Sequence, residues 1–189
     1  METDDHGHSD LKACRAELSH REVDWQQTWK LECLPGLSSE DQTFLWRMLY
    51  NILPTQARLH RLWLRNAPTP NCTQCDMLEP EVLSQALLTC PKKQEVTLWL
   101  LNSLQPYILN PQPQNLVLLN LGSIDKEDEL TVVRLVLNVL SITWQTRKDR
   151  KMPNLFQTRS TLEERFSILR KSRYLNTSME LSNMLNTST

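Results

Sequence analysis

Three cysteines in the middle of the chain have the spacing of metal ligands. Cys72 and Cys75 form a C-x-x-C pair, and Cys90 follows at the end of a predicted helix. A C-x-x-C pair that faces a later cysteine is how short segments gather zinc ligands. One ligand of a four-coordinate site is missing from this set. The pattern therefore predicts either a weak zinc site with three thiolates or a metal-free, reduced loop.

No fourth ligand has regular spacing. His60, Glu79 and Glu81 could fold toward the three thiols, but none stands at the expected distance along the chain. Of the five cysteines, Cys14 and Cys33 show no ligand spacing and are predicted to be small hydrophobic residues. The number of cysteines is odd, and the N-terminal residues are polar and acidic, unlike a signal peptide. Both features indicate a reducing compartment, so we expect an intracellular protein of the nucleus or cytoplasm.

A basic segment precedes the cysteine pair. Residues 42–75 contain no acidic residue, although the whole chain has a net charge of −1. The arginines of this segment are Arg47, Arg58, Arg61 and Arg65. The last three fall at i, i+3 and i+7 of a predicted helix, so they line one edge of it. This row predicts sequence-independent contacts to the phosphates of an RNA or DNA backbone; a solvated helix face is the alternative.

The elements that position these residues are predicted to be helices. The 189-residue chain has only three glycines, too few for a β-rich protein, and its apolar residues recur with helical period. Ser39 and Gln42 have the form of a capping box, so a helix should begin near Glu40 and end or kink at Pro54. The next helix should begin near Thr55. Its predicted core side is Leu59, Leu62 and Trp63.

Further helices are predicted on both sides of Cys90 and towards the end of the chain. Pro80 suits the first turn of one helix, and Pro91 should restart the chain as another. Residues 130–144 are apolar almost all round, which predicts a central, buried helix. Residues 110–115 are predicted to be an irregular linker, and residues 161–170 a last amphipathic helix.

These patterns predict one mostly α-helical domain with a small degenerate zinc-knuckle loop. Its parts are an acidic N-terminal segment with a short helix (1–38), a helical region with the cysteine loop (39–107), a helical C-terminal part (108–174) and a loose tail (175–189). No apolar run reaches membrane-spanning length, so no membrane partner is expected.

The order of these features carries a resemblance. FLWRMLYNILPTQARLHRLWLRNAPTPNCTQC followed by LLTCP resembles the zinc-binding region after the reverse-transcriptase domain of non-LTR (LINE-type) retrotransposons. The resemblance covers about a third of the chain, roughly residues 41–104. It implies that two cysteines, a histidine and a final cysteine hold zinc. The matching positions are Cys72, Cys75, Gln85 and Cys90, so glutamine stands where the family has its histidine ligand.

The resemblance implies nucleic-acid binding, and the motifs that the chain lacks argue against catalysis. The catalytic aspartates of a polymerase palm have no place among predicted helices, and the chain has no phosphate-binding glycine loop or G-x-S-x-G motif. We therefore expect a non-catalytic, retrotransposon-derived nucleic-acid-binding module, with no small-molecule substrate. The alternative is a helical protein-interaction module, or a decayed retrotransposon fragment without a selected activity.

Overall fold

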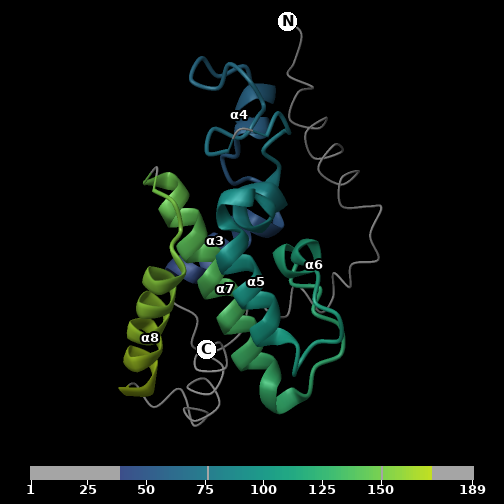
Figure 1. Ribbon diagram of the computed structural model, residues 1–189, viewed down its shortest axis with the longest axis vertical. Helices are drawn as coiled ribbons and strands as arrows, with labels where there is room; N and C mark the ends of the chain where they lie inside the picture. The colour runs from purple at the N-terminus through teal and green to yellow at the C-terminus, as the bar shows by residue number, and fades with distance from the viewer. Residues whose placement is uncertain (1–38, 76, 150, 172–189) are drawn as a thin grey trace, which may run out of the picture.

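Helix α7 (Lys126–Lys148) is the longest element and lies at the centre of the fold (Figure 1). The structure, a computed structural model, describes residues 39–75, 77–149 and 151–171. Residues 131–144 of α7 are buried throughout, which confirms the predicted central helix. Because α7 is apolar on nearly every face, other helices must cover it. Helices α3 (Ser39–Leu49) and α8 (Leu155–Lys171), with the π-helical turn η1 (Gln85–Thr89), pack against it.

Helix α3 begins at the predicted place and buries the predicted stripe. Glu40 and Asp41 lie in its first turn, where the positive end of the helix dipole favours them. The buried residues of the helix are Phe44, Leu45, Met48 and Leu49. It ends at Leu49, five residues before Pro54, because Asn51 adopts a left-handed conformation with φ of 50°.

Helix α4 (Gln56–Arg61) is shorter than the sequence predicts. Thr55 caps it as expected, since its side chain accepts a hydrogen bond from the backbone N–H of Arg58. The helix ends at Arg61, so the predicted core side is wrong beyond Leu59: Leu62 is exposed and Trp63 is 90% exposed. Arg65 lies outside the helix, and the predicted row of three arginines on one helical edge does not form.

The chain between the cysteines and α7 is a series of short helical elements. After η1 comes a 3₁₀ turn, η2 (Pro91–Lys93), which leads into α5 (Gln94–Leu104). Pro91 therefore restarts the chain as predicted. Pro80 lies before the helix rather than in its first turn. The predicted linker at 110–115 is also wrong, because Pro113 begins a short helix, α6 (Pro113–Val117).

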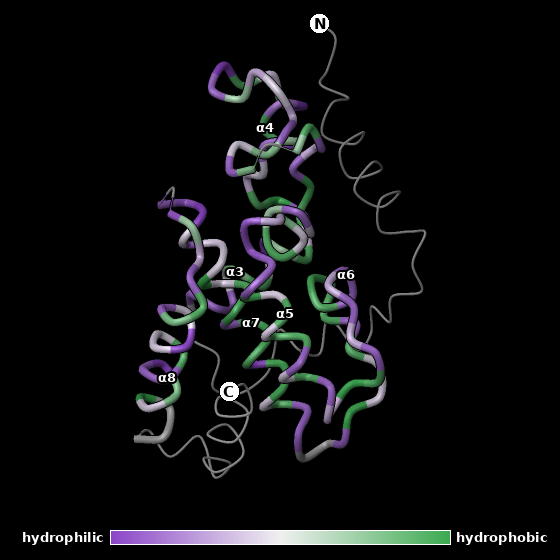
Figure 2. Tube along the Cα trace, in the orientation of Figure 1, coloured by the Kyte–Doolittle hydropathy of each residue, from purple (hydrophilic) through white to green (hydrophobic). Residues whose placement is uncertain are grey.

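These helices share one hydrophobic core. Buried side chains from Phe44 in α3 to Phe166 in α8 form a single cluster. Figure 2 shows the hydrophobic segments in green along α7 and its neighbours, with hydrophilic segments at the periphery. The described residues contain no β-strand, only an isolated antiparallel bridge between Asn71 and Pro80, so the mostly α-helical prediction is confirmed. None of the described helices has both the length and the apolar character needed to cross a membrane.

Three helices end with the same backbone motif. At Asn51, Trp63 and Leu119 the backbone has a positive φ, and two hydrogen bonds close the last turn in the Schellman pattern. For α4 these bonds join Trp63 N to His60 O at 2.9 Å and Leu64 N to Leu59 O at 3.2 Å. Glycine is the usual residue at this position, because the left-handed conformation costs a residue with a Cβ about 1–2 kcal/mol.

Several predictions concern residues outside the described ranges. These are the short helix and acidic segment of 1–38, with Cys14 and Cys33, and the loose tail of 175–189.

Candidate metal centre

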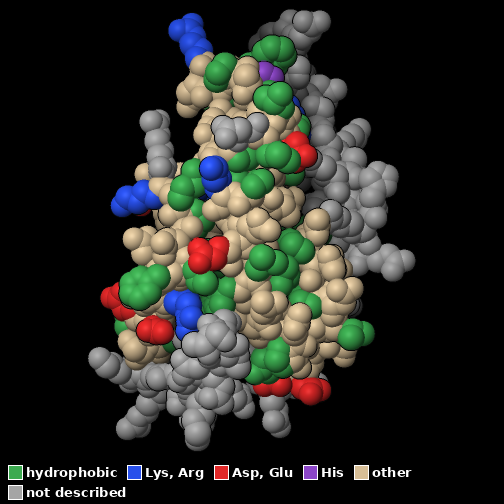
Figure 3. Space-filling view, in the orientation of Figure 1, with side chains coloured by type: hydrophobic (Ala, Val, Ile, Leu, Met, Phe, Trp, Pro, Cys, Tyr) green, Lys and Arg blue, Asp and Glu red, His purple; other side chains and the backbone are tan. Residues whose placement is uncertain are grey.

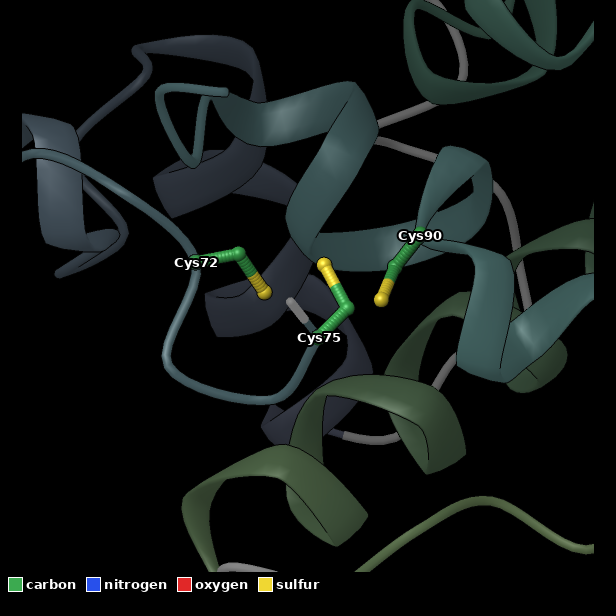
Figure 4. A group of neighbouring side chains, drawn as sticks. All are labelled: Cys72, Cys75 and Cys90. Carbon is green, nitrogen blue, oxygen red and sulfur yellow. The ribbon is translucent and has the colours of Figure 1, made fainter. Parts of the chain in front are cut away.

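The three predicted ligand cysteines meet at one point (Figure 4). Cys72 and Cys75 come from the loop before η1, and Cys90 lies between η1 and η2. Figure 4 shows their side chains pointing toward one another across the loop. Cys72 and Cys90 are buried and Cys75 is half-buried, and all three thiols are free.

Two backbone hydrogen bonds close the loop that carries the first pair. Cys72 N donates to Glu79 O at 3.2 Å, and Glu81 N donates to Pro70 O at 2.8 Å. Inside the loop, Gln74 N donates to Cys72 Sγ at 3.4 Å. These hydrogen bonds fix the position of the Cys72 sulfur within the loop.

The sulfur positions fit a small tetrahedral ion. All three lie within 4.8 Å of one another. With Zn–S bonds of about 2.3 Å, tetrahedral ligand sulfurs lie roughly 3.8 Å apart. A closure of the loop by about 1 Å would therefore suffice for coordination. The site could hold a metal ion such as zinc.

Gln85 lies beside the thiols, as its place in the sequence predicts. Its Nε2 donates to Cys75 Sγ at 3.4 Å. Its Oε1 is buried and has no hydrogen-bond partner. A buried oxygen of this kind is an open position for a ligand, although a neutral carboxamide oxygen binds zinc less well than an imidazole. It is the amide nitrogen of Gln85 that faces Cys75 Sγ, so the protein offers three sulfur ligands and no well-placed fourth ligand.

The other residues considered as fourth ligands are engaged elsewhere or lie apart from the thiols. His60 Nδ1 donates to Ala67 O at 3.0 Å. Glu81 Oε1 accepts hydrogen bonds from the backbone N–H of Gln56, at 3.1 Å, and from Arg147. Its Oε2 is buried without a partner, but the carboxylate does not join the cysteine group. Glu79 is exposed and does not join the cysteine group.

The thiols have different acidities. Burial raises the pKa of the Cys75 thiol, but hydrogen bonds from Met77 N–H, from the other two cysteines and from Gln85 outweigh it, and the net pKa is lowered. Burial raises the pKa of Cys90 to about 12, and the charges of the neighbouring thiolates add to the effect. Without a metal, Cys75 is therefore the first of this pair to ionise.

Lys93 places a buried cation near this site. The residue is 1% exposed, and its Nζ donates to Ala86 O, a carbonyl in the last turn of η1. Thr97 Oγ1 donates to Leu88 O at 2.7 Å, so two side chains satisfy carbonyls that the end of η1 leaves open. A site of three thiolates and one divalent ion carries a net charge of −1, which the Lys93 ammonium would offset.

A buried ion pair joins the cysteine loop to α7. Glu81, between Cys75 and Cys90 in the chain, pairs with Arg147 in the last turn of α7. The Arg147 guanidinium also lies over the Trp144 ring, 4.8 Å from its centroid. Sequence reasoning missed this pair, because 66 residues separate its members and neither periodicity nor spacing connects them.

The four predicted phosphate-binding arginines do not form one row. Arg47 is exposed on α3, Arg61 is exposed at the end of α4, and Arg65 is exposed in the loop that follows. Arg58 is half-buried, and its NH1 donates to Asn51 O at 3.0 Å. Three of the four are thus open to an anionic partner, whereas Arg58 supports the chain between α3 and α4.

In comparison with known proteins, no family model, no curated protein and no solved structure matches this chain.

We expect the metal-free protein to gain stability between pH 8 and 9. Burial lowers the pKa of Lys93 from 10.5 to about 8, despite the opposing attraction of Cys90, Glu81 and Cys72; the Arg147 charge lowers it further. Between pH 8 and 10.5 the unfolded state therefore binds more protons, and stability rises with pH. Cys90 lowers stability as the pH rises above 9.0, the ordinary pKa of its thiol. The reason is that the folded state keeps this proton up to about pH 12, whereas the unfolded state loses it near pH 9.

Urea unfolding in the presence of a chelator, at intervals across pH 7 to 10, measures this effect. Lys93→Met should reduce the rise between pH 8 and 9 to the part that the lowered pKa of Cys75 contributes. Above pH 9 it should show a fall in stability caused by Cys90, which Lys93 offsets in the wild type. A wild-type profile that is flat or falling from pH 8 to 9 would contradict the assignment.

Proposed function

We propose that the chain is a non-catalytic nucleic-acid-binding module, derived from the region after the reverse-transcriptase domain of a non-LTR retrotransposon. Its partner is the RNA or DNA backbone, and its place is the nucleus or cytoplasm, where free thiols persist. The observation that carries the proposal is the exposed position of Arg47, Arg61 and Arg65 in a segment without acidic residues.

The metal site supports the same assignment. Three neighbouring thiolates favour zinc over harder ions. Cys72, Cys75 and Cys90 converge, and Gln85, at the position of the family's histidine, lies beside them. This agreement in place as well as in spacing favours descent from a four-ligand zinc loop. In the proposed module the metal is structural: it fixes the loop that follows the arginines.

The surface charge suits a phosphate backbone. Figure 3 shows a basic side chain projecting at the end of the molecule that carries α4, beside apolar side chains. Arginine contacts to phosphate are independent of sequence and release counterions, so binding weakens with salt. Three contacts imply a log–log slope of affinity against salt of roughly −2 to −3, depending on strandedness.

Replacing both Arg61 and Arg65 with glutamine should flatten this slope by about 1.4–1.8, because two phosphate contacts are lost. The fold should keep its stability, since both side chains are exposed. Fluorescence anisotropy with a labelled oligonucleotide at four salt concentrations measures the slope. Lys92→Gln with Lys151→Gln is the matched control, because it removes the same charge from exposed residues outside the segment.

Arg58→Gln should behave differently. It removes the hydrogen bond to Asn51 O, so it should lower the free energy of unfolding by about 1 kcal/mol with less effect on the salt slope. Equal slopes for wild type and for the Arg61/Arg65 double variant would contradict the proposed contacts.

A helical protein-interaction module is the second candidate. The exposed apolar residues Leu62, Trp63 and Leu64 favour it, because they form a continuous run after α4. It predicts no salt-dependent affinity for any oligonucleotide.

A further inference from the structure

Trp63 is an exposed tryptophan in a backbone conformation that tryptophan rarely adopts. Its φ is 53°, in the left-handed region, and its side chain is 90% exposed. A bulky residue at positive φ is an outlier, and such strain persists only where the surrounding structure or a function maintains it.

The other two helix ends with this motif have an evident reason for their residue. Asn51 belongs to a residue type that tolerates the left-handed conformation, because its short polar side chain can bond locally. Leu119 is 2% exposed, so its burial in the core offsets the strain. Trp63 has neither compensation. Because the Trp63 side chain is 90% exposed, burial does not offset the strain.

The backbone around Trp63 is held firmly. Besides the two hydrogen bonds that close α4, Ala67 N donates to Leu64 O at 2.9 Å, and His60 Nδ1 donates to Ala67 O. Ala67 itself is buried. The loop after α4 is thus tied back to the helix, and it presents the indole to solvent from a fixed position.

Positive charge flanks the indole on both sides along the chain. Arg61 precedes Trp63 by two residues and Arg65 follows it by two, and both are exposed. Aromatic rings interleaved with exposed arginines are how proteins bind single-stranded nucleic acid: the ring stacks on a base and the cations meet the phosphates. In a duplex the bases are paired and stacked on one another, so an indole has no free base face to stack on.

We infer that Trp63 stacks on a base of single-stranded RNA or DNA while Arg61 and Arg65 contact the adjoining phosphates. The inference rests on the proposed function and narrows it, from a nucleic-acid backbone of any kind to a single strand with accessible bases. The left-handed backbone at Trp63 would then serve to keep the indole exposed to solvent, where a base can stack on it.

Trp63→Gly tests the inference in the full-length chain. Glycine suits a positive φ, so the thermal midpoint should stay equal or rise. Affinity for a fluorescein-labelled single-stranded oligonucleotide should fall about 5- to 150-fold, the range expected for one lost stacking contact. Trp63→Phe should recover part of the loss, because it restores an aromatic ring. The matched control is Phe156→Ala, which removes an exposed aromatic residue from α8.

Three probes of equal length separate the possible results: a single strand, a duplex, and a single strand of abasic sites, which keeps phosphates and lacks bases. Support for the inference is wild-type preference for the base-bearing single strand, with Trp63→Gly reduced to the affinity that wild type has for the abasic strand. Equal wild-type affinity for all three probes, unchanged in Trp63→Gly, overturns the inference and leaves the backbone-binding function standing. Absence of salt-dependent binding to every probe overturns both the inference and the backbone-binding function.

Discussion

Replacing Glu81 with glutamine is expected to lower the free energy of unfolding by about 3–5 kcal/mol, because it leaves the largely buried Arg147 guanidinium without its counter-charge. The Glu81 side chain is 1% exposed and that of Arg147 is 13% exposed. The carboxylate also accepts a hydrogen bond from Gln56 N, the first residue of α4, so the substitution acts on two elements together. Urea unfolding of the metal-free protein measures the loss.

Two controls separate the loss of the largely buried ion pair from the effect of removing a negative charge as such. Asp41→Asn removes a carboxylate that lies 3.7 Å from Arg165, a pair with more solvent exposure, and should cost about 0–1 kcal/mol. The double substitution Glu81→Leu with Arg147→Met should restore most of the loss, since an apolar pair can replace a buried ion pair. If Glu81→Gln costs no more than Asp41→Asn, the buried pair does not hold the loop to α7.

Gln85→His is expected to raise zinc affinity by at least about 10- to 100-fold, because an imidazole nitrogen is a better zinc ligand than a carboxamide oxygen. The structure places residue 85 beside Cys75 Sγ, where a histidine could reach an ion bound by the three sulfurs. A 100-fold gain corresponds to about 2.7 kcal/mol, which should appear as a higher thermal midpoint in excess zinc and vanish with a chelator. Competition with a chromophoric chelator measures the affinity directly.

Gln105→His is the matched control. It makes the same chemical change at an exposed position at the end of α5, and it should leave zinc affinity unchanged. Wild-type protein is expected to bind zinc weakly or not at all. Stoichiometric zinc in the wild type that resists chelators would mean that the present residues already complete the coordination.

The parts of the fold that the sequence predicts well are those governed by long apolar patterns. α7 was predictable because its apolar residues surround the helix, and α3 because its stripe and acidic first turn agree. The end of α4 was not, because the usual signal for a left-handed helix end is glycine and the chain has a tryptophan there. The linker predicted at residues 110–115 was wrong because proline has two meanings. In a polar stretch it usually indicates a break, but it also suits the first turn of a helix, as Pro113 does in α6.

At the candidate site, spacing predicted which cysteines meet but not what surrounds them. The C-x-x-C loop and Cys90 converge as expected, and Gln85 lies where the resemblance implies. Lys93 could not have been anticipated, since a lysine is rarely buried, and its role depends on a carbonyl left open by a π-helical turn that has no clear sequence signal. The start of α8 shows a signal that could have been used: Asn154 Oδ1 accepts a hydrogen bond from Gln157 N, which is an N-cap following Pro153.

The ion pair between Glu81 and Arg147 makes the cysteine loop inseparable from the helical core. Glu81 lies between two of the ligand cysteines, and Arg147 ends the helix that the other helices cover. Coupling between two equilibria is reciprocal. If a bound metal strengthens the packing of the loop against α7 by some factor, packing against α7 raises the metal affinity by the same factor. Substitutions deep in α7, far from any sulfur, would therefore weaken metal binding, and a peptide of residues 70–91 alone would bind metal less tightly than the full chain. In Gln85→His, where tighter zinc binding is expected, such distant substitutions should lower the zinc affinity.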